Sequence, residues 1–312
     1  IRVMAAAKEH NYHPNSRAMQ LATGRAMAVG HVIPIASQHE IENPIFADFT
    51  AGAGETYSRN NYDMLLSVVR DEDEAQTYRN LKMKGNVDGV ILHGAHEIDP
   101  RITLLREIGL PFLVHGRATG MEEPYSWLDV NNRRAFLKAA EYLLDLGHTR
   151  IALVNGLESM GFAIRRRTGY LDALAARGIQ PDPQLMASSD MTELAGFRAA
   201  KAMLALPNPP TAFLAASMIS GMGVRRAIES AGLELGRDVS VILFDDDLSY
   251  MKNGEDEPIF TAMRSSVREA GRLAAEMLLH LIAHPDSGPL QRLLEAELVI
   301  GQSTGPVRPR AS

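Results

Sequence analysis

The sequence predicts an α/β protein with two lobes, each a parallel sheet flanked by helices, connected by several crossovers of the chain. Its 312 residues are about twice the length of an average domain. From residue 26 onward, short apolar runs of strand length alternate with segments of helical spacing, which is the pattern of β-α-β units. The alternation breaks near 125–131 and 245–260 and then returns as one short unit. Two series and a returning unit indicate two lobes with a cleft at the carboxyl ends of the strands.

Each element is predicted from the spacing of its apolar residues. Short apolar runs indicate strands at 28–35, 63–69, 89–92, 111–115, 151–155, 212–216 and 239–244. Apolar positions in helical register indicate helices at 46–60, 73–84, 100–108, 132–146, 162–177, 193–206 and 219–231. The returning unit should contain a strand at 259–264, a helix at 267–283 and a strand at 292–300. Several helices stop at a residue that readily closes a helix: Gly109, Gly147, Gly178 and Gly232.

The composition is that of an ordinary globular protein, with 46% hydrophobic and 22% charged residues. The absence of cysteine excludes a disulfide scaffold, a thiolate metal site and a cysteine nucleophile, and it fits a reducing compartment. An uncharged stretch at 203–224 contains three prolines and two glycines, so it indicates a loop, a strand and a helix start rather than a membrane span. No secretory signal opens the chain. We therefore expect a cytoplasmic protein with no membrane partner.

The net charge of −6 is unevenly distributed along the chain. Residues 1–25 carry +3, whereas the remainder carries −9. A basic N-terminal arm on an acidic body indicates that a polyanion such as DNA would be met by the arm alone.

The first 25 residues lie outside the β-α alternation and carry a pattern of their own. They read V-x-x-A-A-x-x-x-x-Y-x-P-N-x-x-A-x-x-L-x-T-G-R over 3–25, followed by the strand VGHVIP at 29–34. Further segments are VDGVIL (87–92), LGHTRIA (146–152), RRTGY (166–170), FDD (244–246), ELVI (297–300) and Ser303-Thr304. In this order, the segments resemble the lactose-repressor/galactose-repressor (LacI/GalR) family of bacterial transcriptional regulators over essentially the whole chain.

The resemblance implies a two-lobed, periplasmic-binding-protein-like (type I) fold behind a DNA-reading head. Residues 1–25 would be the remnant of the DNA-binding domain plus the hinge helix, with most of a helix-turn-helix upstream of Ile1. The first effector-binding lobe would comprise 26–148 and 262–290. The second would comprise 149–261 and 291–304, and 305–312 would be a tail.

A short hinge helix is expected at 16–23. Asn15 is a good N-cap, and Gly24 ends the helix. A helix of about two turns is marginal in water, so it needs a partner to form. The resemblance implies that two such helices pack in the DNA minor groove, where Leu21 wedges between base pairs beside Ala18. Arg17 and Arg25 would contact phosphates. The alternative is a frayed linker in which Leu21 has no role.

A sugar-binding cleft needs fixed donors and acceptors for hydroxyls and an apolar surface for the ring face. The resemblance implies effector-binding residues at Phe46, Trp127, Arg166, Met191, Ser217 and Asp245. Arg166 and Asp245 would bond the effector, or they would pair with each other. Phe46 would line the pocket or belong to the core, and Trp127 would stack on a sugar or serve packing. Met191 and Ser217 stand where an aromatic residue and an asparagine are usual in the family. The pattern of effector hydroxyls recognised here should therefore differ from that of well-known members. The segment 248–258 is long enough to cover the cleft.

No cofactor, metal site or catalytic constellation is expected. His93 and His96 are spaced like metal ligands, but no further ligand cluster accompanies them, so they are interpreted as loop residues. The favoured function is an effector-responsive DNA-binding regulator, a repressor acting as a homodimer on a pseudo-palindromic operator, with a sugar such as a glucoside as effector. The alternative is a solute-binding protein that delivers a sugar to a transporter. An α/β enzyme has only the fold in its favour.

Overall fold

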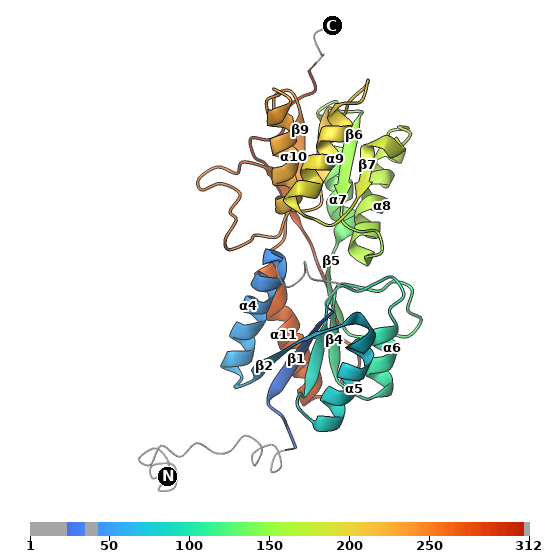
Figure 1. Cartoon of the computed structure of the whole chain (residues 1–312), viewed down its shortest axis with the longest axis vertical. Coiled ribbons are helices and arrows are strands. Elements are labelled where there is room, and N and C mark those ends of the chain that lie inside the picture. Colours follow the sequence, from blue (N-terminus) through green and yellow to red (C-terminus); the bar gives the residue numbers. More distant parts are fainter. Residues whose placement is uncertain (1–23, 35–42, 309–312) are drawn as a thin grey trace.

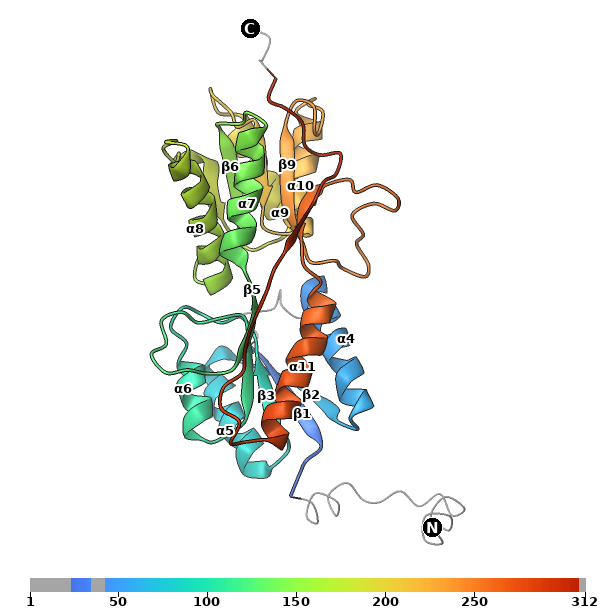
Figure 2. The ribbon, with the colours of Figure 1, turned by 180° about the vertical axis from the view of Figure 1, so that it is seen from behind.

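The computed structural model of the chain describes residues 24–34 and 43–308. It confirms the predicted fold class: two α/β lobes follow one another along the long axis of the molecule (Figures 1 and 2). In the described residues, each lobe has one sheet of six strands with helices on both faces. Short 3₁₀ turns lie at Asp71–Asp73 and Pro183–Leu185.

The first sheet contains only parallel pairs of strands. Its spatial order is β11 (Gln291–Leu294), β5 (Trp127–Val130), β4 (Phe112–His115), β3 (Gly89–Leu92), β1 (Ala28–Pro34) and β2 (Asp63–Val69). One face is covered by α4 (Pro44–Arg59) and α11 (Val267–Ala283), and the other by α5 (Glu74–Lys84) and α6 (Pro100–Glu107). Because successive side chains of a strand point to opposite faces, Ala28 and Val32 of β1 join one core and Val29 joins the other.

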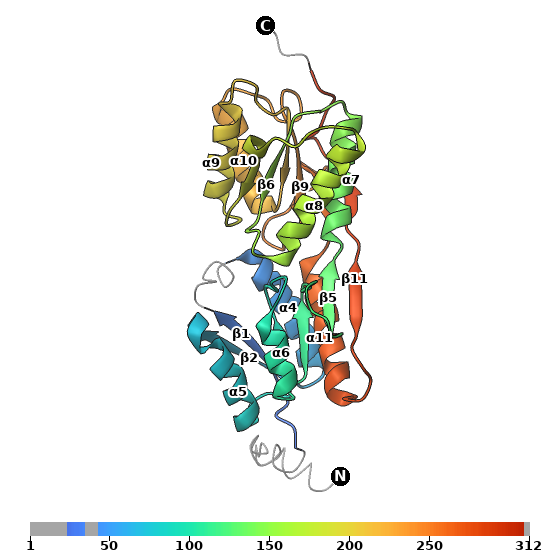
Figure 3. The same cartoon turned by 90° about the vertical axis from the view of Figure 1, so that its right-hand side faces the viewer.

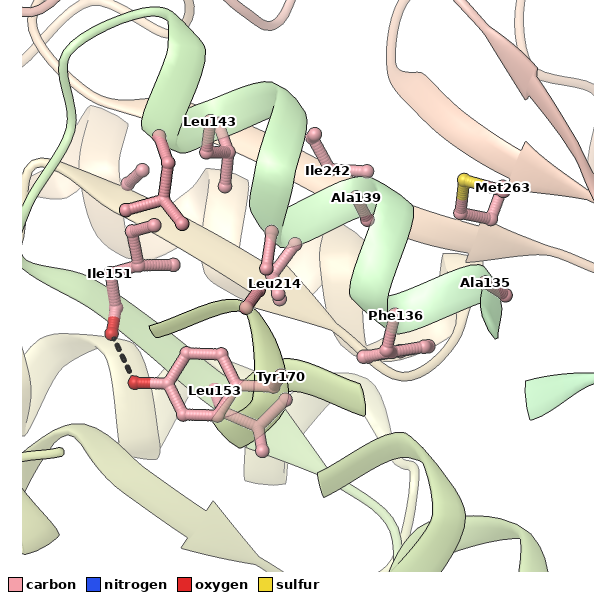
Figure 4. Packing of buried hydrophobic residues seen from close by; sticks show 14 of the residues in the cluster. Ala135, Phe136, Ala139, Leu143, Ile151, Leu153, Tyr170, Leu214, Ile242 and Met263 are labelled. Carbon is pink, nitrogen blue, oxygen red and sulfur yellow. Dashed lines mark hydrogen bonds between the residues drawn. The ribbon is translucent and has the colours of Figure 1, made fainter. Parts of the chain in front are cut away.

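The second sheet follows the same plan and ends in one antiparallel pair. Its order is β12 (Glu297–Val299), β10 (Thr261–Arg264), β9 (Ser240–Asp245), β8 (Ala212–Ala215), β6 (Ile151–Asn155) and β7 (Met186–Ser188). One face is covered by α7 (Asn132–Asp145) and α8 (Gly161–Ala176), and the other by α9 (Glu193–Leu204) and α10 (Met218–Ser230). Figure 4 shows the core beneath α7 and α8, where the Tyr170 hydroxyl donates to the carbonyl of Ile151 at 2.9 Å.

Neighbouring helices approach closely at glycines. At Gly169, a Cβ atom would lie 2.0 Å from the carbonyl oxygen of Arg133, so α8 can contact α7 only because that atom is missing. Gly271 meets the backbone of α4 in the same way, with 2.0 Å between an added Cβ and the carbonyl oxygen of Phe49. One helix pair on each lobe therefore depends on a glycine at the point of closest contact.

Within its described part, the chain passes between the lobes three times: after β5, after β10 and after β11. The first and third passages lie side by side, because β5 and β11 pair in parallel at the edge of the first sheet (Figure 3). Both strands run toward the second lobe, where α7 and β12 follow directly.

The strand pairing corrects the predicted lobe boundaries. Helix α7 belongs to the second lobe, where it packs on α8, although 26–148 was assigned to the first. Strand β11 belongs to the first sheet, although 291–304 was assigned to the second lobe, and the strand expected at 292–300 is divided into β11 and β12. The first boundary was placed too late because the chain already crosses to the second lobe at residue 131, within the break in the alternation. The helix that follows, α7, therefore packs on the second sheet.

Candidate functional site

A cavity of about 200 Å³ lies between the two lobes, at the carboxyl ends of strands from both sheets. Open α/β sheets bind ligands at this edge. The cavity is lined from the first lobe by Asn43, Ile45, Phe46, Phe49, His93, Gly94, Ala95, His115, Gly116, Arg117, Asp129, Val130, Val267 and Ala270. From the second lobe and the crossovers it is lined by Asn132, Phe162, Arg165, Arg166, Met191, Ala216, Phe244, Asp246, Ser265 and Ser266.

The first lobe contributes an aromatic wall from the start of α4. Asn43 caps this helix by accepting a hydrogen bond from the backbone N–H of Ile45 at 3.0 Å, and Pro44 follows the cap. The cap directs the first turns of α4 at the cavity. Phe49 stacks on His115 with 4.1 Å between ring centroids, and Phe46 meets the ring of His93 edge-on at 5.1 Å. This wall is apolar except for its imidazole nitrogens.

The imidazoles in and behind this wall are neutral. His31 lies behind His93 in β1, and its Nδ1 is 3.0 Å from His93 Nε2. Burial lowers the pKa of His31 to about 4, helped by the charge of His115, and burial alone lowers the pKa of His115 to about 4. The pKa of His93 is also lowered well below its ordinary value by burial and by the neighbouring histidines. At neutral pH, these rings therefore act as uncharged hydrogen-bonding groups.

Arg166 provides the charged centre of the opposite wall. Its Nε donates to Asn132 Oδ1 at 2.7 Å, and its Nη1 donates to the carbonyl of Ala216. The guanidinium lies 4.1 Å from the ring centroid of Phe244 and 5.0 Å from that of Phe162. Burial lowers the pKa of Arg166 to about 10, so it stays charged at neutral pH. Arg166 is thus held in place by the second lobe before any ligand arrives.

The carboxylate that reaches the cavity is Asp246, one residue after the expected Asp245. Burial raises the pKa of Asp246 to about 7, and the charge of Arg166 opposes that rise. Asp245, the last residue of β9, accepts a hydrogen bond from the backbone N–H of Asp247 at 2.9 Å and lies 3.9 Å from Arg264 Nε. It does not line the cavity. Successive residues of an extended chain point to opposite sides, so the one-residue difference separates the two carboxylates.

A second charged group lies where the chain first crosses between the lobes. Asp129 Oδ2 is 3.0 Å from Arg165 Nη2 of the second lobe and 3.4 Å from Arg117 Nε of the first. Arg165 also donates to the carbonyl of Arg117 at 3.0 Å. Burial raises the pKa of Asp129, and the two arginine charges oppose that rise. Among the described residues, Asp129 Oδ2 and the Nε atoms of both arginines are buried without a hydrogen bond of good geometry, so charge attraction holds these atoms together.

The structure brings three of the six expected effector-binding residues to the cavity: Phe46, Arg166 and Met191. Trp127 is the first residue of β5, at the strand end away from the cavity, and it packs in the first-lobe core beneath the guanidinium of Arg117 at 5.0 Å. Ser217 is buried as the N-cap of α10 and forms a capping box with Ser220.

The remaining predicted residues are placed as follows. The segment 248–258 does not line the cavity, and its Ser249 contacts the first lobe instead, through hydrogen bonds to Asp48 at 2.6 Å. Among the expected hinge residues, Arg25 is described and lies close to Tyr62. The others lie outside the described residues: Asn15, Arg17, Ala18 and Leu21.

Several polar residues of the cavity were not predicted from the sequence: His93, His115, Arg117, Asp129, Asn132, Arg165 and Asp246. A common signal was present for three of them, because His93 directly follows a buried apolar strand and His115 and Asp129 lie at the ends of two others. Polar residues at the carboxyl ends of adjacent parallel strands meet at one edge. In the part of the chain that is described, no three His, Cys, Asp or Glu residues are arranged to hold a metal ion.

Comparisons with known proteins agree with this architecture. A family model described as a periplasmic binding protein-like domain matches residues 140–304. The regulator AglR of Rhizobium meliloti (strain 1021), described as an HTH-type transcriptional regulator, is 42% identical over 311 residues, which are 99% of this chain and 87% of AglR. A solved regulatory protein of the LacI family from Chloroflexus aggregans is 25% identical with a TM-score of 0.76, covering 90% of this chain and 99% of that one.

The chain belongs to the LacI family of transcriptional regulators.

Two further comparisons of this LacI-family regulator carry the name CelR. CelR of Thermobifida fusca, described as an HTH-type transcriptional regulator, is 30% identical over 302 residues, 96% of this chain and 88% of CelR. A solved structure of a transcriptional regulator CelR–cellobiose complex is 29% identical with a TM-score of 0.79, covering 96% of this chain and 89% of that one. The relatives are regulators, which supports the favoured function over transporter delivery. No helix within residues 24–34 and 43–308 has the length and apolarity to cross a membrane.

Proposed function

We propose that this LacI-family regulator binds a sugar in the cavity between its lobes and that the bound sugar changes its affinity for operator DNA. The observation that carries the proposal is the cavity itself. Aromatic rings and neutral imidazoles form one wall, Arg166 and Asp246 form the other, and the group of Arg117, Asp129 and Arg165 joins the two lobes between them. Such a site offers ring-stacking surface together with fixed donors and acceptors for hydroxyls. The CelR–cellobiose complex, a structure of the same family, supports a sugar ligand.

The coupling to DNA follows from linkage. A ligand shifts an equilibrium only by its different affinity for two states. Here the cavity groups come from both lobes, so a sugar favours the arrangement in which Arg165 and Asp246 face the first-lobe wall. The proposal assigns the DNA contact to the N-terminal region, with Leu21 as the minor-groove wedge. Because operator DNA lies in the bacterial cytoplasm, the regulator acts there.

A homodimer is part of the proposal. Strand β2 forms one edge of the first sheet, and its Leu66 and Val68 side chains are 47% and 51% exposed in the described structure. An apolar edge strand is a surface that proteins usually cover. Pairing with a second copy would cover it and would match a two-fold operator.

Calorimetry with cellobiose, maltose, trehalose and sucrose tests the sugar site. We expect at least one of these disaccharides to bind the wild-type chain, and Arg166→Met to abolish that binding because it removes the central charge. Arg167→Met is the matched control, since the Arg167 guanidinium pairs with Glu158 and does not line the cavity. If Arg166→Met binds as tightly as wild type, the cavity is not the sugar site.

Gel-shift assays with the full-length regulator test the DNA part. Leu21→Ala should weaken operator binding because the wedge is lost, while disaccharide binding by calorimetry stays intact. Unchanged operator affinity would remove Leu21 from the DNA contact.

A further inference from the structure

Three buried polar side chains form a chain from the interior of the first lobe to the cavity. The Tyr57 hydroxyl of α4 is 3.3 Å from His31 Nε2, and His31 Nδ1 is 3.0 Å from His93 Nε2. His31 in β1 pairs with Ile91 of β3, two residues before His93, so His31 and His93 lie on the sheet face that α4 covers. Only His93 of the three lines the cavity.

The direction of these hydrogen bonds follows from counting protons. Tyr57 is buried, and burial raises the pKa of its hydroxyl, so the hydroxyl keeps its proton. Among the described residues, its hydrogen-bond partner is His31 Nε2. If that nitrogen carried a proton, the hydroxyl proton would have no acceptor there, and a buried unsatisfied donor is costly. Tyr57 therefore donates to His31 Nε2.

The same count assigns the proton of each imidazole to one of its two nitrogens. His31 is neutral and so carries one proton, which must sit on Nδ1 and is donated to His93 Nε2. His93 is neutral as well, so its single proton sits on Nδ1. In the described structure, His93 Nδ1 has no hydrogen-bond partner and is not among the polar atoms sealed from solvent. This nitrogen is open to the cavity.

We propose that Tyr57 and His31 set His93 as an uncharged hydrogen-bond donor toward the cavity, so that a bound sugar must place an acceptor oxygen at this point. The inference rests on the proposed function for the identity of the ligand. A ring or glycosidic oxygen satisfies the requirement, because it accepts and cannot donate. An ammonium group, as on an amino sugar, offers only donors and is rejected there. Tyr57 and His31 are positioning residues, and His93 is the residue that determines specificity.

Nuclear magnetic resonance of ¹⁵N-histidine-labelled protein tests the proton positions without any ligand. Long-range ¹H–¹⁵N correlations distinguish the two neutral tautomers, and a His93→Gln variant assigns the signals. We expect His93 to carry its proton on Nδ1 in the wild type. Tyr57→Phe removes the donor that starts the chain, so His93 should shift to a mixture of tautomers. A wild-type His93 protonated on Nε2, or one unaffected by Tyr57→Phe, would overturn the proposal.

Tyr170→Phe is the matched control, because Tyr170 is equally buried and donates one hydrogen bond to Ile151 in the other lobe. It should leave the signals of His93 unchanged. In calorimetry with the same four disaccharides, Tyr57→Phe should weaken binding by about threefold to tenfold, the effect of one hydrogen bond, and Tyr170→Phe should not. Equal binding by Tyr57→Phe and wild type would overturn the specificity role. If the wild type binds none of the four, the proposed function fails, and the ligand-free spectra still decide the tautomer.

Discussion

Asp246→Asn should make the ligand-free protein more stable while it weakens sugar binding. The wild-type carboxyl has its pKa raised from 3.8 to about 7 in the folded protein by burial. Well below pH 3.8 it is protonated in both the folded and the unfolded chain and contributes nothing. As the pH rises, the unfolded chain releases its proton first, so the free energy of unfolding falls until about pH 7 and then stays constant. At about 1.4 kcal/mol per pH unit, the loss approaches about 4 kcal/mol.

The assay is chemical unfolding of wild type and Asp246→Asn at pH 5 and at pH 8. Asparagine carries no charge, so the variant lacks this loss and its advantage over wild type should be larger at pH 8. If the difference in free energy of unfolding between the variant and wild type is the same at both pH values, or smaller at pH 8, then burial does not oppose the ionisation of Asp246. In calorimetry, the same variant should lose about tenfold or more in disaccharide affinity, because hydrogen bonds to charged groups contribute about 1.5–3 kcal/mol.

Asp245→Asn is the matched control for the binding measurement. Its Oδ1 accepts from the backbone of Asp247, and an asparagine oxygen can accept in the same way. We expect normal disaccharide affinity. If Asp245→Asn binds the disaccharide poorly and Asp246→Asn binds it normally, then Asp245 is the sugar-binding carboxylate, as the sequence indicated.

Three further changes test the contact between the lobes, the helix packing and the dimer. Arg165→Met removes the 3.0 Å ion pair to Asp129, so the lobes should separate more readily and the radius of gyration from small-angle X-ray scattering should increase; an unchanged radius would mean that other contacts hold the lobes. Gly169→Ala would place a Cβ atom 2.0 Å from the carbonyl oxygen of Arg133, so the free energy of unfolding should fall by about 1–3 kcal/mol in denaturant titration. A loss within the roughly 0.5 kcal/mol of an ordinary surface change would contradict that close contact. Leu66→Lys should yield monomers in analytical ultracentrifugation, and a persistent dimer would place the interface elsewhere.

Most of the fold was accessible from local sequence patterns. The buried parallel strands are continuous apolar runs, and α7 and α11 present apolar residues in helical register, so each could be recognised without knowing its neighbours. The short edge strand β7 was not predicted because its three residues, Met186–Ser188, have no sustained apolar pattern. Strand β5 was not predicted for another reason. Its third residue is Asp129, and Asn131 and Asn132 follow directly after the strand, so the apolar pattern is interrupted beside the cavity.

The cavity was only partly accessible, because its residues meet through the fold. Arg166 was identified from its position before Gly169, where a local motif sets its place on α8. The group formed by Arg117, Asp129 and Arg165 joins a loop, a crossover strand and a helix of the other lobe, and no spacing in the chain brings them together.

The amino-acid sequence by itself determined that this protein is a two-lobed α/β protein with a cleft at the strand ends, because periodicity and capping are local properties that each segment carries alone. Its function as a regulator was implied by the motifs that resemble the LacI/GalR family. The tertiary structure decided which side chains enter that cleft and in which protonation state. Whether Asp245 or Asp246 faces Arg166 depends on the side to which each side chain points at the end of β9. Whether His93 donates or accepts depends on Tyr57 and His31, which are far from it in the chain. Burial and hydrogen-bond partners are set by neighbours in space, and these exist only after the segments have packed.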